Sequence, residues 1–440
     1  MENQLLLGIS RKNITPKVGG RLMGYKPDIY SESINDELTV DAYYFEEGET
    51  KALLISAALC VVSTNITNAL LAEIEEKFHI PKNNVILHAI HTHSGPVLSE
   101  AVGWGDPDLE YLEEIFRPML MAAVDEALRS TVPVTMAIGR GDSLVGINRR
   151  EIAVNNTIRL GQNPWGPFDP RMTVISFKSG DTVVANFVHY GTHATAAGMN
   201  REVTRDWPGP MIDSMEDVFG GQCSFFNGPE GDVGPRMICG KTTGGIKDGV
   251  LINHVRYAMQ IGAVAAQDAV RITRTVGGYH TPTLAVSHTD IKIPLKPRIS
   301  LEEATEKYEE FSKYTVNILG KKANYYRTII ESYSNGYKEE EFETVGQTII
   351  KIGEVAFVAF SYELFSEIGM RIARASKIPY TLSLSNANGV TGYFPTESDL
   401  CRGGYEVESF KTRDYQSMVD NADWHLVTGT LEHIDAMLNK

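Results

Sequence analysis

Residues 85–96 read VILHAIHTHSGP, a run of apolar and β-branched residues that ends in two spaced histidines and a turn signal. The apolar part predicts a buried β-strand, and Ser-Gly-Pro predicts the turn that ends it. Because side chains alternate across a strand, His91 and His93 are expected on the same face. Two imidazoles in such a place are metal ligands, one ligand and its neighbour, or two solvated loop histidines.

The residues before this stretch place it in a βαβ unit. Residues 51–62 predict a buried strand, and residues 65–78 have apolar side chains at helical spacing, with Thr64 or Asn65 as the helix cap. The order of strand, helix and strand predicts parallel pairing of the two strands. Ligand sites in such sheets form at the C-terminal ends of strands, which is where the two histidines lie.

Polar side chains also follow three other predicted strands: His193 after residues 182–189, Glu363 after residues 355–360 and Tyr393 after residues 380–384. Taken alone, Glu363 is more simply an acid in the first turn of a helix, where it interacts with the helix dipole. His189, at the end of its strand, is expected to be a core histidine bonded to backbone.

The loop at residues 227–236 reads NGPEGDVGPR and holds too many glycines and prolines for regular structure. Its compactness predicts backbone N–H groups that face a site. It lacks the Gly-Lys-Ser/Thr ending of a Walker A loop.

The composition bounds the functions that this chain can have. It has 440 residues, 42% of them apolar and 22% charged, as is ordinary for a globular protein, and its net charge is −15. The acidic balance argues against nucleic acid and against stable association with anionic membranes. The start of the chain lacks a signal peptide and no run of about 18 apolar residues occurs, so a cytoplasmic protein is expected. Four scattered cysteines without a Cys-x-x-Cys pair argue against a thiolate zinc site.

These segments together resemble the catalytic domain of the neutral (non-lysosomal) ceramidase family. The shared pieces occur in the family's order across residues 23–406: MGY at 23–25, HTHSGP at 91–96, NRR at 148–150, the second histidine loop, GDVxP at 231–235, the strand–Glu–helix junction and GYxxT at 392–396.

The resemblance implies one zinc ion with four protein ligands: His91, His193, Glu363 and Tyr393. It leaves one coordination position for water. It also implies four positions near the substrate: Gly24, Arg149, Gly234 and Tyr405. His93 is then the residue that touches the substrate or the water, Arg149 binds a polar substrate group, and Asp232 orients loop or ligand groups.

Two departures from the family pattern change the expected chemistry. The family reads GDVSP and its serine is the proposed nucleophile, whereas this chain has Gly234 there. A water activated by zinc is therefore the expected attacking group. The family's C-terminal immunoglobulin-like β-sandwich is also expected to be absent, since the chain ends at Lys440 soon after the last motif.

Three functions are compatible with these residues. The first is a zinc-dependent hydrolase that cleaves an amide, or else an ester, in a small soluble molecule. The second is a true ceramidase, and the third is an inactive metal-containing binding protein.

The expected fold is α/β, with mixed β-sheets covered by helices. Length alone favours about three domains, but ligands at 91, 193, 363 and 393 must converge, which favours one domain over 1–440, with a sub-lobe allowed at 275–345.

Overall fold

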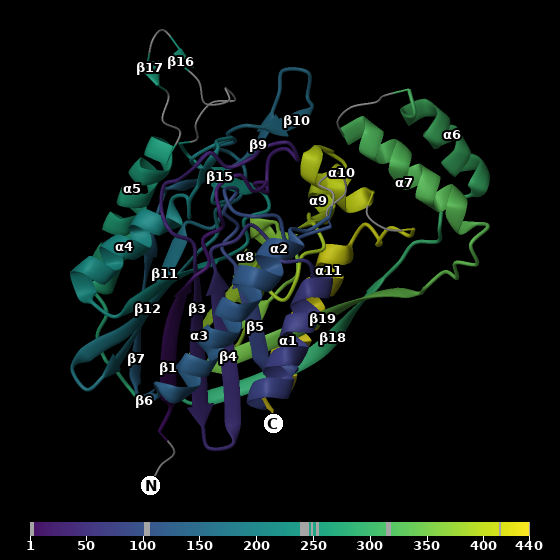
Figure 1. Ribbon diagram of the computed structural model, residues 1–440. Helices are drawn as coiled ribbons and strands as arrows, with labels where there is room; N and C mark the ends of the chain where they lie inside the picture. The colour runs from purple at the N-terminus through teal and green to yellow at the C-terminus, as the bar shows by residue number, and fades with distance from the viewer. Residues whose placement is uncertain are drawn as a thin grey trace.

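The structure is a computed structural model that describes residues 4–100, 106–237, 246–247, 250–251, 255–313, 318–412 and 415–439. Three β-sheets form the middle of the molecule, and α-helices cover them on the outside (Figure 1). The protein is therefore a mixed α/β fold, as the order of predicted strands and helices indicates.

The first sheet has the strand order β5-β4-β3-β1-β6. Its strands are β1 (Leu6–Asn13), β3 (Thr39–Glu47), β4 (Thr50–Ala57), β5 (Val85–Ala89) and β6 (Val132–Pro133). β5 runs parallel to β4 and is connected to it through α1 (Thr64–Phe78), so the predicted βαβ unit is confirmed. The cap of α1 is Ser63, one residue before the predicted ones, because the Thr64 hydroxyl instead donates to the Val390 carbonyl.

The second sheet has the order β14-β12-β11-β7, and the third has the order β18-β19-β20-β22. Their strands are β7 (Thr135–Asp142), β11 (Arg171–Ser179), β12 (Thr182–Tyr190), β14 (Gln222–Asn227), β18 (Leu284–Pro294), β19 (Phe342–Ile352), β20 (Val355–Ala359) and β22 (Tyr380–Leu384). β12 is parallel to β14 and β20 is parallel to β22, while the other neighbours are antiparallel. Each sheet thus contains one parallel pair.

Aromatic side chains from all three sheets meet in one buried core. The Phe187 ring of β12 lies 5.1 Å from those of Phe177 and Phe226, and 6.1 Å from Phe357 of β20. Phe45 of β3 lies 6.4 Å from Phe187. Burying one such side chain stabilises the fold by roughly 1.5–3 kcal/mol. This core fixes the three sheets relative to one another, and with them the ends of their strands.

Helices cover the outer faces of the sheets. Because strand residues alternate in direction, Tyr43 and Phe45 enter the central core while Ala42 and Tyr44 face helices. The covering helices are α3 (Arg117–Arg129) on the first sheet, α4 (Pro208–Phe219) and α5 (Val255–Thr273) on the second, and α8 (Ser366–Ala375) and α11 (Ala422–Leu438) on the third.

Residues 109–129 form three helical pieces in succession. α2 (Leu109–Tyr111) leads into the π-helical turn η2 (Leu112–Phe116) and then into α3. Pro118 lies in the first turn of α3, where the missing N–H needs no partner. The proline therefore lies where it does not interrupt the hydrogen bonds of α3.

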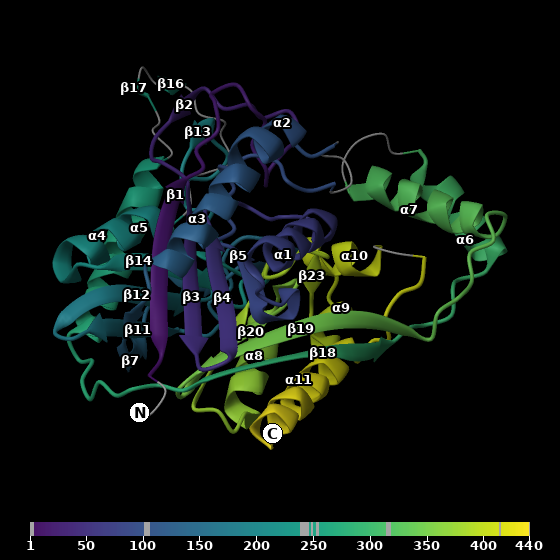
Figure 2. The same ribbon diagram turned by 60° about the horizontal axis from the view of Figure 1, so that its bottom comes forward.

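The helix α6 (Leu301–Phe311) is capped by Ser300 and is followed along the chain by α7 (Ile318–Ser332). Both helices lie at the far end of the long β18–β19 pair (Figure 2). β18 pairs with β19 over its whole length and so belongs to the third sheet. The boundaries 275 and 345 of a sub-lobe stay a prediction.

The remaining elements are short: β2 (Ser33–Ile34), η1 (Lys82–Asn84), β8 (Gly146–Asn148), β9 (Arg150–Ile152), β10 (Ile158–Leu160), β13 (Glu202–Val203), β15 (Val233–Pro235), β16 (Ile246–Lys247), β17 (Val250–Leu251), β21 (Glu363–Leu364), β23 (Tyr393–Phe394), α9 (Glu397–Leu400) and α10 (Tyr405–Lys411). In the part of the chain that the structure describes, no helix has the length and apolar character needed to cross a bilayer.

Candidate metal centre

Three side chains from three different sheets converge on one buried point. His91 follows β5, His193 follows β12, and Glu363 lies in β21 after β20. The Glu363 Oε2 atom is 3.4 Å from His91 Nε2 and 3.1 Å from His193 Nε2. The ligand atoms of all three residues lie within 4.8 Å of one another. Residues separated by as many as 272 positions in the chain therefore form one cluster, at the ends of strands.

The spacing of these atoms fits a tetrahedral ion. Ligand atoms about 2.1 Å from a tetrahedral zinc ion lie about 3.4 Å apart. The two nitrogen–oxygen distances given above match that separation. A pair of imidazole nitrogens and a carboxylate oxygen is also a donor set that zinc accepts.

Backbone carbonyls fix the orientation of both imidazole rings. His91 Nδ1 lies 2.9 Å from the Cys60 carbonyl, and His193 Nδ1 lies 2.8 Å from the Glu230 carbonyl and 3.2 Å from that of Val233. A carbonyl accepts, so each Nδ1 carries the proton and each Nε2 lone pair faces the cluster. This is the arrangement that outer partners give to histidines that bind a metal.

The charges and lone pairs of His91, His193 and Glu363 favour a cation between them. His193 Nε2 and Glu363 Oε2 are buried without a hydrogen-bond partner among the described residues. Burial, with the nearby charge of Arg149, lowers the pKa of His193 to about 3, so its lone pair stays available. Burial opposes a positive charge on His91, but the Glu363 carboxylate outweighs this effect and raises the pKa of His91. A proton on His91 would then balance the charge of Glu363, as a metal ion would. The residues therefore fit a zinc ion.

Tyr393 is held beside this cluster by a short parallel ladder. β21 pairs with β23 so that Glu363 and Tyr393 are direct partners, and the Glu363 N–H donates to the Gly392 carbonyl at 2.9 Å. Arg149 Nη2 donates to the Tyr393 hydroxyl at 3.0 Å. Burial, with the charge of Glu363, raises the pKa of Tyr393 well above its usual value. A bound divalent cation acts in the opposite direction and favours the phenolate.

The argument from strand alternation is wrong for the two neighbouring histidines. β5 ends at Ala89, and His91 adopts a left-handed backbone with φ 68°. Such a conformation is strained in a residue with a side chain and is characteristic of functional positions. The rings nevertheless meet, with His93 Nε2 lying 3.2 Å from His91 Nε2, because the turn brings them together.

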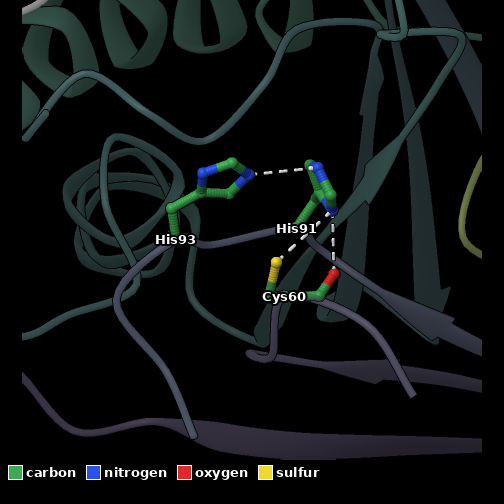
Figure 3. A group of neighbouring side chains, drawn as sticks. All are labelled: Cys60, His91 and His93. Atoms are coloured by element: carbon green, nitrogen blue, oxygen red, sulfur yellow. Dashed lines mark hydrogen bonds between the residues drawn. The ribbon is translucent and has the colours of Figure 1, made fainter. Parts of the chain in front are cut away.

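His93 is the imidazole next to the proposed ligands. Figure 3 shows His91 between His93 and Cys60, with one ring nitrogen toward each. The Tyr25 ring packs edge-on against His93 at 5.0 Å. Burial, together with the charges of His91 and His193, lowers the pKa of His93 well below its usual value. His93 is thus a neutral imidazole at the edge of the cluster.

Gly24 is where backbone approaches His93 most closely. A Cβ atom at this position would lie 2.3 Å from His93 Cγ, and the Gly24 φ angle is +124°. Gly24→Ala is therefore expected to displace the His93 ring and to destabilise the fold by about 2–4 kcal/mol, from backbone strain and overpacking. Urea unfolding and the rate of turnover would both register the change.

Gly19 supplies the matched control for that substitution. Its φ angle is +100°, but a Cβ there meets nothing within 4 Å. Gly19→Ala should cost only the backbone strain, about 1–2 kcal/mol, and leave turnover unchanged. Equal effects of the two variants would show that Gly24 does not position His93.

Arg149 and Arg150 share a buried carboxylate. Glu406 Oε1 accepts from Arg149 Nε at 3.1 Å, and its Oε2 accepts from Arg150 Nη1 at 2.7 Å. The Glu406 side chain is 1% exposed. Arg149 thus has a carboxylate partner within this chain, and its role toward a substrate stays a prediction. Tyr405 is 39% exposed, and its ring packs edge-on against that of Tyr393 at 5.5 Å.

Asp232 organises the loop around the cluster. Its Oδ1 accepts from the Ser366 backbone N–H at 2.6 Å, and its Oδ2 accepts from the Ser366 hydroxyl and from Asn148 Nδ2. It thereby satisfies the N-terminus of α8, a role considered for Glu363, which instead lies in β21. Burial raises the pKa of Asp232 to about 7. The structure thus places Asp232 among donors from β8 and from α8.

The loop at residues 227–236 presents the Glu230 and Val233 carbonyl oxygens to His193 Nδ1. Three of its N–H groups donate to backbone carbonyls instead of facing the site: Gly228 to Tyr190, Gly231 to Leu364 and Val233 to Glu230. For the other N–H groups of the loop, the prediction stays a prediction. Gly234 pairs with Ile147 in the β15–β8 ladder. Among the described residues, a Cβ at Gly234 would meet only Arg149, at 3.6 Å and beyond.

Two residues of the site carry no signal in the sequence that singles them out. Glu406 follows Tyr405 in a stretch of ordinary charged residues, and Cys60 acts through its carbonyl oxygen. The prediction that His189 is a core residue is confirmed, since its Nε2 donates to the Ser383 carbonyl at 3.0 Å.

Residues 5–272 match the family model described as neutral/alkaline non-lysosomal ceramidase, N-terminal. Neutral ceramidase A of Dictyostelium discoideum is 26% identical over 244 residues, which cover 50% of this chain and 34% of that protein. Neutral ceramidase of Oryza sativa subsp. japonica is 25% identical over 225 residues, or 48% of this chain and 29% of that protein. The chain thus spans about a third of the length of these relatives.

Two solved structures share the fold over 99% of this chain. The neutral ceramidase from Pseudomonas aeruginosa aligns with a TM-score of 0.72 and 17% identity over 74% of its chain. A ceramidase complexed with C2 aligns with a TM-score of 0.73 and 16% identity over 75% of its chain.

Proposed function

The chain belongs to the neutral/alkaline non-lysosomal ceramidase family, and we propose that it is a zinc-dependent hydrolase that cleaves an amide, or alternatively an ester, in a small substrate. The observation that carries the proposal is the tetrahedral spacing of His91, His193 and Glu363. We propose Tyr393 as the fourth ligand, because its ladder with β21 holds it beside Glu363.

A zinc ion at this point would supply a Lewis acid that polarises a carbonyl and lowers the pKa of water to about 7. The remaining work falls to the residues of this chain. His93 is neutral and lies at the edge of the cluster, so it can accept a proton from water and return it to the leaving amine. In the net reaction, the water oxygen bonds to the carbonyl carbon and the C–N bond breaks. The amine leaves with the proton that His93 has returned to it.

Arg149 positions the polar part of the substrate in this proposal. Although burial opposes its charge, neighbouring Tyr393 and Glu406 raise the pKa of Arg149, so it remains a guanidinium at any working pH. Its Nε and Nη2 are held by these two residues. A fixed cation of this kind stabilises the negative charge that develops on a carbonyl oxygen.

The attacking group in this proposal is water, because Gly234 occupies the position of the family's GDVSP serine and has no side chain. Gly234→Ser is expected to fold normally, since its Cβ would make only van der Waals contact with Arg149. We expect turnover to change by less than about tenfold, because the hydroxyl replaces no group that reacts.

Gly234→Ala is the control for that substitution, since it adds the same Cβ without the hydroxyl. A gain of 100-fold or more in the serine variant alone would show that the wild-type protein has lost its nucleophile. The third hypothesis, a metal-containing binding protein, would then become the better description.

The experiment that tests the proposed function is a panel of N-acyl and ester substrates that includes a short-chain ceramide. Turnover of a small amide that stops with a chelator and returns with zinc is the expected result. Turnover confined to the ceramide would favour the second hypothesis, a true ceramidase. The relatives that are named neutral ceramidases support that hypothesis. No metal-dependent turnover of any member would contradict both hydrolase proposals.

We also propose that residues 1–440 form one domain. The reason is that the proposed ligands come from strands of all three sheets, which share the Phe187 core. A division of the chain into independent sequential domains between residues 91 and 393 would split the cluster.

A further inference from the structure

A small cavity of about 30 Å³ lies among strands of the second and third sheets and α8. Its polar lining includes Arg140, Arg171, Thr173, His189 and Ser383. None of these residues belongs to the proposed metal centre. The cavity exceeds the roughly 10–15 Å³ that one water molecule needs, and its volume suits a monatomic or similarly small ion.

The charges of the residues that line this cavity do not cancel. Both oxygens of Asp169 accept from Arg171, at 2.7 and 2.6 Å. Arg140 donates from Nε to the Thr173 hydroxyl at 3.0 Å, and within the described residues it forms no ion pair. Asp142 also faces Arg171 but does not line the cavity. The lining thus carries two guanidinium groups and one carboxylate, a net charge of about +1.

Burial and the charge of Arg171 lower the pKa of Arg140, which agrees with a cation that lacks a full counter-charge. A partly buried charge is costly unless an opposite charge accompanies it. The side chain that stacks on Arg140 is Tyr380, with its ring centroid 4.5 Å from Cζ, and it supplies no formal charge.

Two hydroxyl groups of the lining can donate hydrogen bonds. Ser383 is 3% exposed, and its Oγ has no partner among the residues described. Thr173 Oγ1 accepts from Arg140, which leaves its own hydrogen for another acceptor. His189 donates from Nε2 to the Ser383 carbonyl, and burial lowers its pKa to about 4. It therefore adds no charge to the lining of the cavity.

We propose that this cavity binds a small monovalent anion, which is chloride under ordinary conditions. The net positive charge selects an anion, the hydroxyl donors complete its hydrogen bonds, and the volume restricts it to a monatomic or similarly small ion. This site does not depend on the proposed hydrolase function.

The position of the cavity links the anion to the loop that holds His193. Pro229 forms part of the lining, and the next residue, Glu230, provides the carbonyl that accepts from His193 Nδ1. Gly228 packs against the His189 ring, where an added Cβ would lie 2.9 Å from Nε2. A bound anion therefore stabilises this loop, and with it the folded state.

The test is the melting temperature of the full chain in sodium chloride or bromide against sodium gluconate at constant ionic strength. A ligand that binds only the folded state raises the melting temperature in a saturable manner. We expect such a rise with both halides and none with gluconate. Arg140→Met should abolish it, whereas Arg159→Met, which removes an exposed arginine paired with Glu151, should retain it.

Ser383→Ala provides a second, milder variant, and it should weaken halide binding roughly tenfold through the loss of one hydrogen bond to a charged group. An anomalous bromide peak in the cavity of a crystal is expected as well. A peak without saturable stabilisation in solution would mean an adventitious ion only and would overturn the proposal. An equal halide response in wild type and Arg140→Met, or in wild type and Ser383→Ala, would do the same.

Discussion

The variant His193→Asn should lose the bound metal and at least about 100-fold of any turnover. Asparagine can still donate to the Glu230 carbonyl where Nδ1 donates now, but it removes the Nε2 atom that lies 3.1 Å from Glu363. Loss of an outer partner of a metal ligand costs about 10–100-fold, and loss of the ligand itself should cost more. Metal content by mass spectrometry and turnover would be measured on the same sample.

His189→Gln is the control, since it alters a buried histidine only four residues away. Glutamine can keep the donation to the Ser383 carbonyl that Nε2 makes in the wild type. This variant should retain full metal content. Zinc bound equally well by both variants would remove His193 from the ligand set.

The variant Glu406→Gln should lower the free energy of unfolding by about 3–5 kcal/mol, the typical cost of leaving a buried charge without its partner. Glu406 joins two arginines in a site where Arg150 is 4% exposed and Arg149 is 12% exposed. Turnover should fall too, because Arg149 loses the contact that holds it against Tyr393. Urea unfolding would give the stability change.

Glu151→Gln is the matched control on the surface. Glu151 pairs with Arg159, whose side chain is 63% exposed, and exposed pairs of this kind contribute about 0–1 kcal/mol. A change of less than 1 kcal/mol for Glu406→Gln as well would contradict the argument that Glu406 compensates two buried cations.

The sequence predicted the strands of this fold well because their burial leaves a simple pattern. The runs at 85–89, 182–190 and 355–359 are apolar, and their ends carry His91, His193 and Glu363. Strand ends alone did not select these residues, however. Each had a plainer interpretation, and the resemblance to a family combined them into one site.

The pattern of residues along the chain could not predict contacts between residues that are far apart in the sequence. Glu406 lies 257 positions from Arg149, and no periodicity connects them. The carbonyl oxygens of Cys60 and Glu230 act through backbone, so their residue types say nothing of that role. The same-face argument for His91 was wrong, because it assumed that β5 continues beyond Ala89.

Diffraction from crystals of the full chain at the zinc absorption edge would show whether His91, His193 and Glu363 hold a zinc ion. We expect one anomalous peak about 2.0–2.2 Å from His91 Nε2, His193 Nε2 and a Glu363 oxygen. An active, zinc-supplemented protein with no peak there, and with His91 still paired directly to Glu363, would contradict it.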